Sequence, residues 1–484
     1  MEFDFTQPSP AVGTLEEAQA IIDLLWLLLG ELSRQVKSQT QQIEAQAKRI
    51  EELEERLRTN SNNSSKPPSS DVSSVKKLKS KKPKSRRKSG GQPGHKGKSR
   101  ELLPPEEVDH IKRCHPQSHC ECGGLIEQGG LYRRHQIHEL PKVKPVVTEY
   151  QLFEGRCQNC GTPHSGTLPE GVSSLMLGPR AIALVGTLTG AYRMSKRMAQ
   201  ALLHDVCGLK LSLGTVSQTE EVVSFALKSI TEEAKAHVQE GLVVHSDETG
   251  HKEKGAKQWM WVAITGLVCV FLARASRSKA VAKELLGECF AGFLVSDRCS
   301  VYHWIETTRR QLCWAHLIRD FTKMAERSGK AGRIGDHLLH LTKKMFRHWH
   351  SVKEGTLSRT LFAKRMQSIR TDAERTLADG VTCGESKTQN TCKRLLKVKS
   401  ALWNFIDHEG IEPTNNLSEQ MIRHYVVWRK VCYGAQSERG SLYIERVMSV
   451  VGSCRLQGQN ILDFMTQAIS AYLGKGSPPS LLSA

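Results

Sequence analysis

Residues 241–250, GLVVHSDETG, and residues 291–300, AGFLVSDRCS, share a pattern in which a short apolar run leads to serine and then aspartate. β-Branched and aromatic residues of the kind found in strands precede Asp247 in the first segment and Asp297 in the second. A carboxylate at a strand end projects into the crevice where ligands bind in α/β sheets. The two segments therefore predict a sheet with a pair of acids at one edge.

Two more apolar runs lie between these segments. Residues 259–264 and 267–272 are rich in Trp, Val, Ile and Leu, and Gly266 separates them as a turn residue. Helical spacing of apolar residues returns downstream, as in residues 338–345. The predicted fold class is a multidomain α/β protein.

Paired carboxylates indicate metal chemistry, because hard divalent cations bind oxygen ligands and can activate water against a phosphodiester. A third acid is expected downstream, and residues 415–423, NNLSEQMIR, place Glu419 near a predicted helix start. Asn416 followed by Glu419 also fits a capping box, in which Glu419 would satisfy only backbone amides. The competing acids are Glu248, Glu409 and Glu412. Local sequence leaves the choice among them open.

Positive charge is concentrated in one segment of this chain. The 484 residues carry a formal net charge of +19, and residues 76–100 hold 12 Lys or Arg and no Asp or Glu. Such a surplus favours polyanions, and a flexible arm of this kind can neutralise nucleic-acid phosphates. A solvated tail is the alternative. The cations assigned to DNA in this arm are Lys81, Lys82, Arg86, Arg87 and Lys88.

Four cysteines form two predicted zinc knuckles within a module at residues 106–170. The ligands are Cys120, Cys122, Cys157 and Cys160. Thiolates bind structural zinc tetrahedrally, and the second pair has the standard two-residue gap. The first pair is irregular, so His119 is an alternative first ligand. Further candidates are Cys114 and His115, and four unrelated buried cysteines are the other interpretation.

The regions outside these motifs are helical or polar. Apolar residues recur every seven positions through residues 15–58, which predicts a coiled coil, with an amphipathic helix packed on its own domain as the alternative. Residues 59–105 are predicted to be a disordered basic linker. Residues 171–238 are predicted to be helical with a break at Cys207-Gly208, and Ser212 opens the next helix. A DNA-binding helix-turn-helix or a plain helical hairpin fits this region.

Composition also bears on location. No secretion signal opens the chain, and its apolar runs are too short to span a bilayer. Fourteen cysteines without an export signal indicate reduced thiols or metal ligands. The expected location is the bacterial cytoplasm, associated with the nucleoid and without a membrane partner.

These motifs, in this order, resemble those of the bacterial insertion-sequence-66 transposases, over nearly the whole chain. The matching segments are NSSKPPSSD at 63–71, GGQPGH at 90–95, the two cysteine pairs, SDET at 246–249, SDR at 296–298, CWAHL at 313–317 and NNLSE at 415–419. The resemblance implies a ribonuclease-H-like catalytic domain at residues 239–475 with a helical insertion at about 325–410. It further implies that Asp247, Asp297 and Glu419 are catalytic and bind two Mg²⁺ ions, and that Arg429 and Lys430 form the basic pair after the third block.

The function predicted from the resemblance is that of a transposase. The chain would bind the ends of an insertion sequence and catalyse metal-dependent cleavage and strand transfer into target DNA, as a homo-oligomer of at least two copies with possible helper proteins from the same element. Gln420 stands where the family shows Arg, and His119 stands at the usual first cysteine. The alternative is therefore a catalytically inactive DNA-binding protein derived from a transposable element. A nuclease on the same fold is the third hypothesis.

Overall fold

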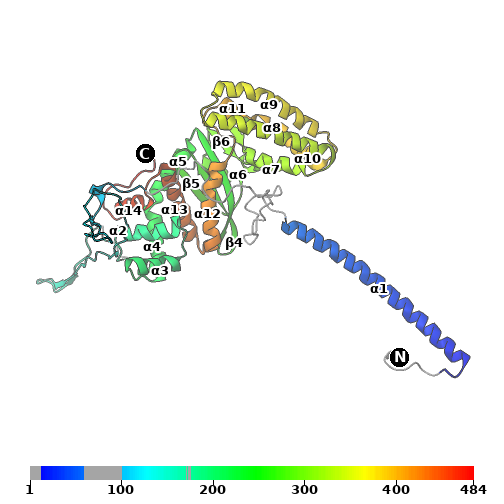
Figure 1. Cartoon of the computed structure of the whole chain (residues 1–484), viewed down its shortest axis with the longest axis horizontal. Helices are drawn as coiled ribbons and strands as arrows, with labels where there is room; N and C mark the ends of the chain where they lie inside the picture. The colour runs from blue at the N-terminus through cyan, green and yellow to red at the C-terminus, as the bar shows by residue number, and fades with distance from the viewer. Residues whose placement is uncertain (1–11, 59–100, 171, 173–175, 484) are drawn as a thin grey trace. The chain divides into compact units, whose positions relative to one another are not determined.

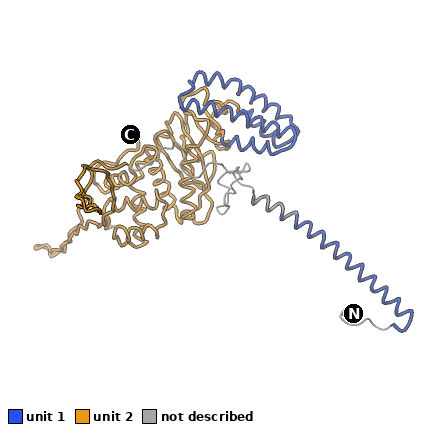
Figure 2. Tube along the Cα trace, in the orientation of Figure 1, with its two compact units in different colours: residues 1–76, 315–397 blue, residues 77–314, 398–484 orange. Residues whose placement is uncertain are grey.

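The computed structural model describes residues 12–58, 101–170, 172 and 176–483. It divides into two compact units (Figure 2): unit 1 comprises residues 1–76 and 315–397, and unit 2 comprises residues 77–314 and 398–484. The prediction of a DNA-binding arm falls outside the described residues, and so do its cations, Lys81, Lys82, Arg86, Arg87 and Lys88.

Unit 2 contains a five-stranded mixed sheet (Figure 1), in the order β5-β4-β3-β6-β7. Its strands are β3 (Val243–Glu253), β4 (Ala256–Ile264), β5 (Cys269–Arg274), β6 (Phe293–Ser296) and β7 (Arg310–Leu312). β3, β4 and β5 pair antiparallel, whereas β6 pairs parallel with β3 and β7 pairs parallel with β6. The sheet predicted from residues 241–300 is confirmed, and β7 extends it.

β3 is longer than its apolar run indicates. It continues to Glu253 and turns into β4 through Lys254 and Gly255, which have φ of +50° and +79°. Positive φ at both residues suits a tight two-residue hairpin. Asp247 therefore lies within β3, and its predicted position at a strand end was wrong. The polar residues that follow it are paired with β4 by tertiary structure, which a search for apolar runs does not detect.

The edge strand β5 is covered by helix α13 (Glu438–Gln457). Alternate backbone N–H groups of β5 donate to side chains spaced four residues apart on α13. The bonds join Cys269 to Ser453, Phe271 to Ser449 and Ala273 to Glu445, at 2.9, 2.8 and 2.9 Å. An exposed strand edge offers unpaired donors to other chains. Here the helix satisfies three of them and closes that side of the sheet.

Helices surround the sheet of unit 2. The remaining ones are α2 (Pro179–Gly186), the π-helical turn η3 (Thr187–Ala191), α3 (Lys196–Cys207), α4 (Leu213–Ala226), α5 (Lys228–Gln239), α6 (Lys279–Leu286), α11 (Asn404–Asp407), α12 (Asn416–Cys432) and α14 (Ile461–Tyr472). Short 3-10 turns are η2 (Pro105–Glu107), η4 (Ser300–Tyr302), η5 (Thr307–Arg309) and η6 (Lys399–Leu402). Residues of α2, α4, α5 and α14 share one buried apolar cluster with the sheet.

The predicted break after α3 is confirmed. Gly208 ends this helix with φ of +68°, a left-handed conformation that glycine adopts without strain. The Ser212 hydroxyl then accepts the Thr215 backbone N–H at 3.0 Å and caps α4. Among the described residues, no helix combines the length and apolar character of a membrane span.

Unit 1 consists of helices. They are α1 (Leu15–Arg58), α7 (Trp314–Ala325, whose first residue belongs to unit 2), α8 (Gly329–Lys353), α9 (Arg359–Gly380) and α10 (Ser386–Lys397). The spacing noted in residues 338–345 corresponds to the buried side of α8, where Leu338, Leu341 and Met345 lie. By contrast, most of the described apolar side chains of α1 are exposed, including Leu29 at 58% and Val36 at 53%.

Candidate active site

The register of the sheet brings Asp247 and Asp297 together. β3 and β6 run parallel with His245 opposite Val295, so two further residues along each strand lead to the two aspartates. Their carboxylates are oriented by the backbone that follows each. Asp247 accepts the Glu248 N–H at 2.9 Å, and Asp297 accepts the Cys299 N–H at 2.8 Å. The predicted strand-end position is confirmed for Asp297.

Glu419 lies in the first turn of α12, and its capping-box interpretation is wrong. The helix begins at Asn416 after Asn415, and within the described residues no side-chain hydrogen bond caps it. The Asn415 side chain instead contacts β3, where its amide donates to the Ser246 carbonyl at 2.8 Å. Alternation along β3 directs odd-numbered residues toward α12 and α13, as the bonds of His251 to Tyr425 and Ser441 show. Asp247 lies on this same side.

Electrostatics place Asp247 at the centre of the acids. The pKa of its carboxyl is raised well above the usual value, chiefly by burial and then by the charges of Glu248, Asp297 and Glu419. Negative charge gathered in a desolvated place favours a bound cation. The carboxylate oxygens present here are the donors that magnesium prefers. Among the described residues, however, Asp297 and Glu419 fall in separate groups of possible metal ligands, and Asp247 falls in neither.

Glu248 is excluded as the acid that faces α12, because it points to the opposite side of β3. Its side chain is fully buried, pairs with Arg277 and accepts the Tyr302 hydroxyl at 2.7 Å. Burial and then the charge of Asp297 raise the pKa of Glu248. Its carboxylate, with Asp297 and the Cys299 thiol, forms one group of possible metal ligands within 4.8 Å of one another. Glu248 thus borders the site from the other face of the sheet.

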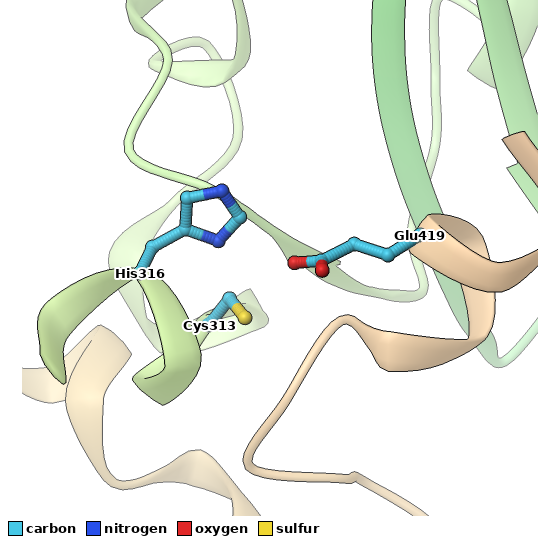
Figure 3. Close-up of side chains that lie close together, drawn as sticks. All are labelled: Cys313, His316 and Glu419. Atoms are coloured by element: carbon cyan, nitrogen blue, oxygen red, sulfur yellow. The ribbon is translucent and has the colours of Figure 1, made fainter. Parts of the chain in front are cut away.

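A second group of possible ligands involves Glu419 (Figure 3). The Glu419 carboxylate and the Cys313 thiol, both in unit 2, are ligand atoms within 4.8 Å of each other. His316, which Figure 3 also labels, belongs to unit 1 and lies in the first turn of α7. The Trp314 backbone and indole both donate within unit 2, to Pro413 and Leu402, each at 2.9 Å. The sequence interpretation used residues 313–317 only as a family motif and gave Cys313 no role of its own.

The two residues of the basic pair after Glu419 differ in their exposure. Arg429 is half-buried and donates to the Thr249 hydroxyl at 3.4 Å, so its guanidinium borders the strand that carries Asp247. Lys430 is exposed. Of the remaining competing acids, Glu409 is exposed, and the charge of Glu412 acts on His245.

The predicted zinc ligands form two local turns. Gly123 and Gly161, each with positive φ, donate their N–H groups to the carbonyls of Cys120 and Cys157. Within the first turn the pKa of Cys122 is lowered, chiefly by a backbone hydrogen bond at Gly124 and then by the Cys120 thiol.

In the second turn the pKa of Cys160 falls to about 7, chiefly through Thr162 and then through the Cys157 thiol. His119 bonds the Ser118 hydroxyl at 3.1 Å. Neither group of possible metal ligands found among the described residues contains a cysteine of these pairs. Each pair therefore meets within its own turn, and the two turns, both within the described ranges, form no common ligand group.

Comparison with known proteins gives two family matches along the chain. The model of the IS66 transposase family matches residues 175–442, which include both aspartates and Glu419. The chain belongs to the IS66 transposase family. Residues 7–101 match a family of unknown function, DUF6444. A relative in Sinorhizobium fredii, described as uncharacterized protein y4qI, is 25% identical over 307 residues, which cover 57% of this chain and 56% of that protein. The chain thus spans little more than half of that relative.

Proposed function

We propose that this member of the IS66 family is a transposase that cleaves and joins DNA, with Asp247, Asp297 and Glu419 as its catalytic acids. The observation that carries the proposal is the parallel register of β3 and β6, which brings Asp247 and Asp297 side by side although they lie 50 residues apart in the sequence (297 − 247). The charges of Asp297 and of Glu419, which lies 172 residues from Asp247 (419 − 247), also raise the pKa of Asp247. Unrelated surface acids have no reason to converge in a desolvated site. Perturbed carboxyl groups gathered from separate segments are typical of active sites.

The sheet supports a ribonuclease-H-like core for residues 239–475. Three antiparallel strands, β5, β4 and β3, are continued by the parallel strands β6 and β7. In this order β3, which contains Asp247, is the neighbour of β6, which ends just before Asp297. In this interpretation the helices between β7 and α12 are the insertion proposed at about 325–410.

The proposed chemistry assigns a role to each acid. Asp247, Asp297 and Glu419 would hold two Mg²⁺ ions, whose charge activates the attacking oxygen and stabilises the leaving oxygen of a phosphodiester. Asp247 must be ionised to bind a cation, and its raised pKa ties binding to deprotonation. Arg429 borders the same strand and is placed to contact a DNA phosphate once the bond to Thr249 is exchanged.

DNA recognition is proposed for regions outside the acid site. The basic arm would contact phosphates, and a structural zinc ion would draw together the turns of Cys120, Cys122, Cys157 and Cys160. Oligomerisation is proposed through α1. Among the described residues of its heptad, Ile22 and Ile43 are exposed in a single copy (47% and 65%), and a second copy would bury such side chains. Two copies would hold two element ends.

A strand-transfer assay tests the proposal. DNA carrying the sequences that flank the gene is incubated with the full chain and Mg²⁺, and products joined to a target are measured. Asp247→Asn should abolish joining, whereas Asp379→Asn, at an exposed aspartate of α9, should not. Binding without cleavage by the unaltered chain would favour the inactive DNA-binding alternative. Nicked products that are never joined would favour a nuclease.

A further inference from the structure

Asn415 contacts two of the segments that carry the proposed acids. It is 1% exposed and lies immediately before α12. Its side-chain amide donates to the carbonyl of Ser246, the residue before Asp247, at 2.8 Å. Its own carbonyl accepts the backbone N–H of Glu419 at 3.1 Å. One residue thus joins the strand of the first acid to the helix turn of the third.

The link to the second acid passes through Cys313. The backbone N–H of Asn415 donates to the Cys313 thiol at 3.1 Å. The backbone N–H of Cys313 in turn donates at 2.9 Å to the carbonyl of Ser296, the residue before Asp297. The hydrogen bonds of Asn415 and Cys313 therefore reach the residue before Asp247, the residue before Asp297, and Glu419 itself.

We propose that Asn415 is a positioning residue that holds the three acids of the proposed transposase site in one geometry. This inference rests on the proposed function, since it assigns Asn415 a purpose through Asp247, Asp297 and Glu419. Asn415 itself would touch neither metal nor DNA. Partners of this outer kind orient metal ligands, and their loss typically weakens metal affinity or activity by about 10- to 100-fold.

The chemistry of asparagine fits this position. The amide nitrogen can only donate, which the Ser246 carbonyl requires, and the amide oxygen can only accept. The oxygen lies 3.2 Å from His245 Nδ1, so that nitrogen must carry the proton. Burial lowers the pKa of His245, although the bond to Asn415 and the charge of Glu412 oppose that shift. Aspartate would lose the donor, and alanine or leucine would lose both side-chain contacts.

The chain supplies a matched control, because the next residue, Asn416, is also asparagine and is exposed. The full chain is titrated with Mn²⁺ alone, without DNA, and the site of interest is the binding lost in Asp247→Asn. Asn415→Ala should weaken Mn²⁺ at that site by about 10- to 100-fold. Asn416→Ala should stay within about twofold of the unaltered chain, as surface substitutions generally do little.

A second variant separates positioning from packing. Asn415→Leu keeps the number and branching of the side-chain heavy atoms and removes only their polarity, so a role limited to filling space predicts affinity near the unaltered value. The positioning role predicts a loss as large as that of Asn415→Ala, and melting temperatures recorded on the same samples identify any variant that has unfolded.

Unchanged Mn²⁺ affinity in either folded variant would overturn the proposal. So would unfolding of both variants, since Asn415 would then be a residue of general stability. If the unaltered chain has no Asp247-dependent Mn²⁺ site, the proposed function itself fails, and that result is distinct from a site that ignores Asn415.

Discussion

The acids around Asp247 and the cysteines of residues 106–170 are both candidate metal ligands, but they are organised differently. The acids come from β3, the end of β6 and α12, and buried hydrogen bonds of Asn415 and Cys313 tie those elements together. The cysteines lie in two short turns, and three of the four are exposed. Thus the acid site is assembled by the core of unit 2, whereas each cysteine pair is assembled by its own few residues.

The acids and the cysteines also differ in the direction in which their pKa values are shifted. The pKa of the Asp247 carboxyl is raised, chiefly by burial, because packing forces acids together in a desolvated place. The pKa of the exposed Cys160 thiol is lowered to about 7, chiefly by the Thr162 hydroxyl. Packing thus brings the acids together, whereas each cysteine pair lies in its own turn and the four cysteines form no common ligand group among the described residues. A cation should therefore change catalysis at one site and local folding at the other.

The largest expected effect tests whether the acid site is the chemical one. Glu419→Gln should lower the rate of DNA cleavage by about 10³-fold or more, because residues that act as one catalytic unit fail together. Glu409→Gln, at an exposed competing acid of the same region, should leave the rate within about twofold. Single-turnover cleavage of labelled DNA measures both. Equal cleavage rates in the two variants would show that Glu419 is not a catalytic acid.

A smaller effect is expected at the cysteines. Replacing Cys157 and Cys160 by serine together should remove about one zinc ion per chain and weaken DNA binding by about tenfold, since a structural zinc stabilises the fold around its ligands. Metal analysis and binding titrations measure these losses. The control is Cys289→Ser, another exposed cysteine. Loss of zinc in Cys289→Ser, or the absence of bound zinc from every sample, would contradict a zinc site at the two cysteine pairs.

The smallest effect concerns stability in the absence of metal. A carboxyl whose pKa is raised by folding stabilises the protein below its unfolded pKa, and this contribution is lost as pH rises through the folded value. At neutral pH in EDTA, Asp247→Asn should therefore be more stable than the unaltered chain, by on the order of 1 kcal/mol. The difference should vanish below about pH 4, the usual range of Asp. Urea unfolding at several pH values measures it, and a less stable variant at neutral pH would contradict the raised pKa.

Much of the site can be predicted from the amino-acid sequence alone. Ser-Asp after apolar runs indicates a sheet with two acids, and the structure confirms that sheet and the position of Asp297 after β6. The length of β3 cannot be predicted in this way, because its second half is polar and owes its pairing to β4 and α12. The break after α3, by contrast, can be predicted from the sequence, because Gly208 and Ser212 specify a helix end and a helix start locally.

Local chemistry alone determined the strand-forming runs, the helix caps and the two cysteine turns, since each depends on residues a few positions apart. It could not choose between Glu419 as a cap and Glu419 as an acid beside Asp247, because both interpretations use the same residues. The tertiary structure excludes the capping box, because α12 begins at Asn416, which is therefore its first residue and not its cap. Strand alternation also turns Asp247, rather than Glu248, toward α12.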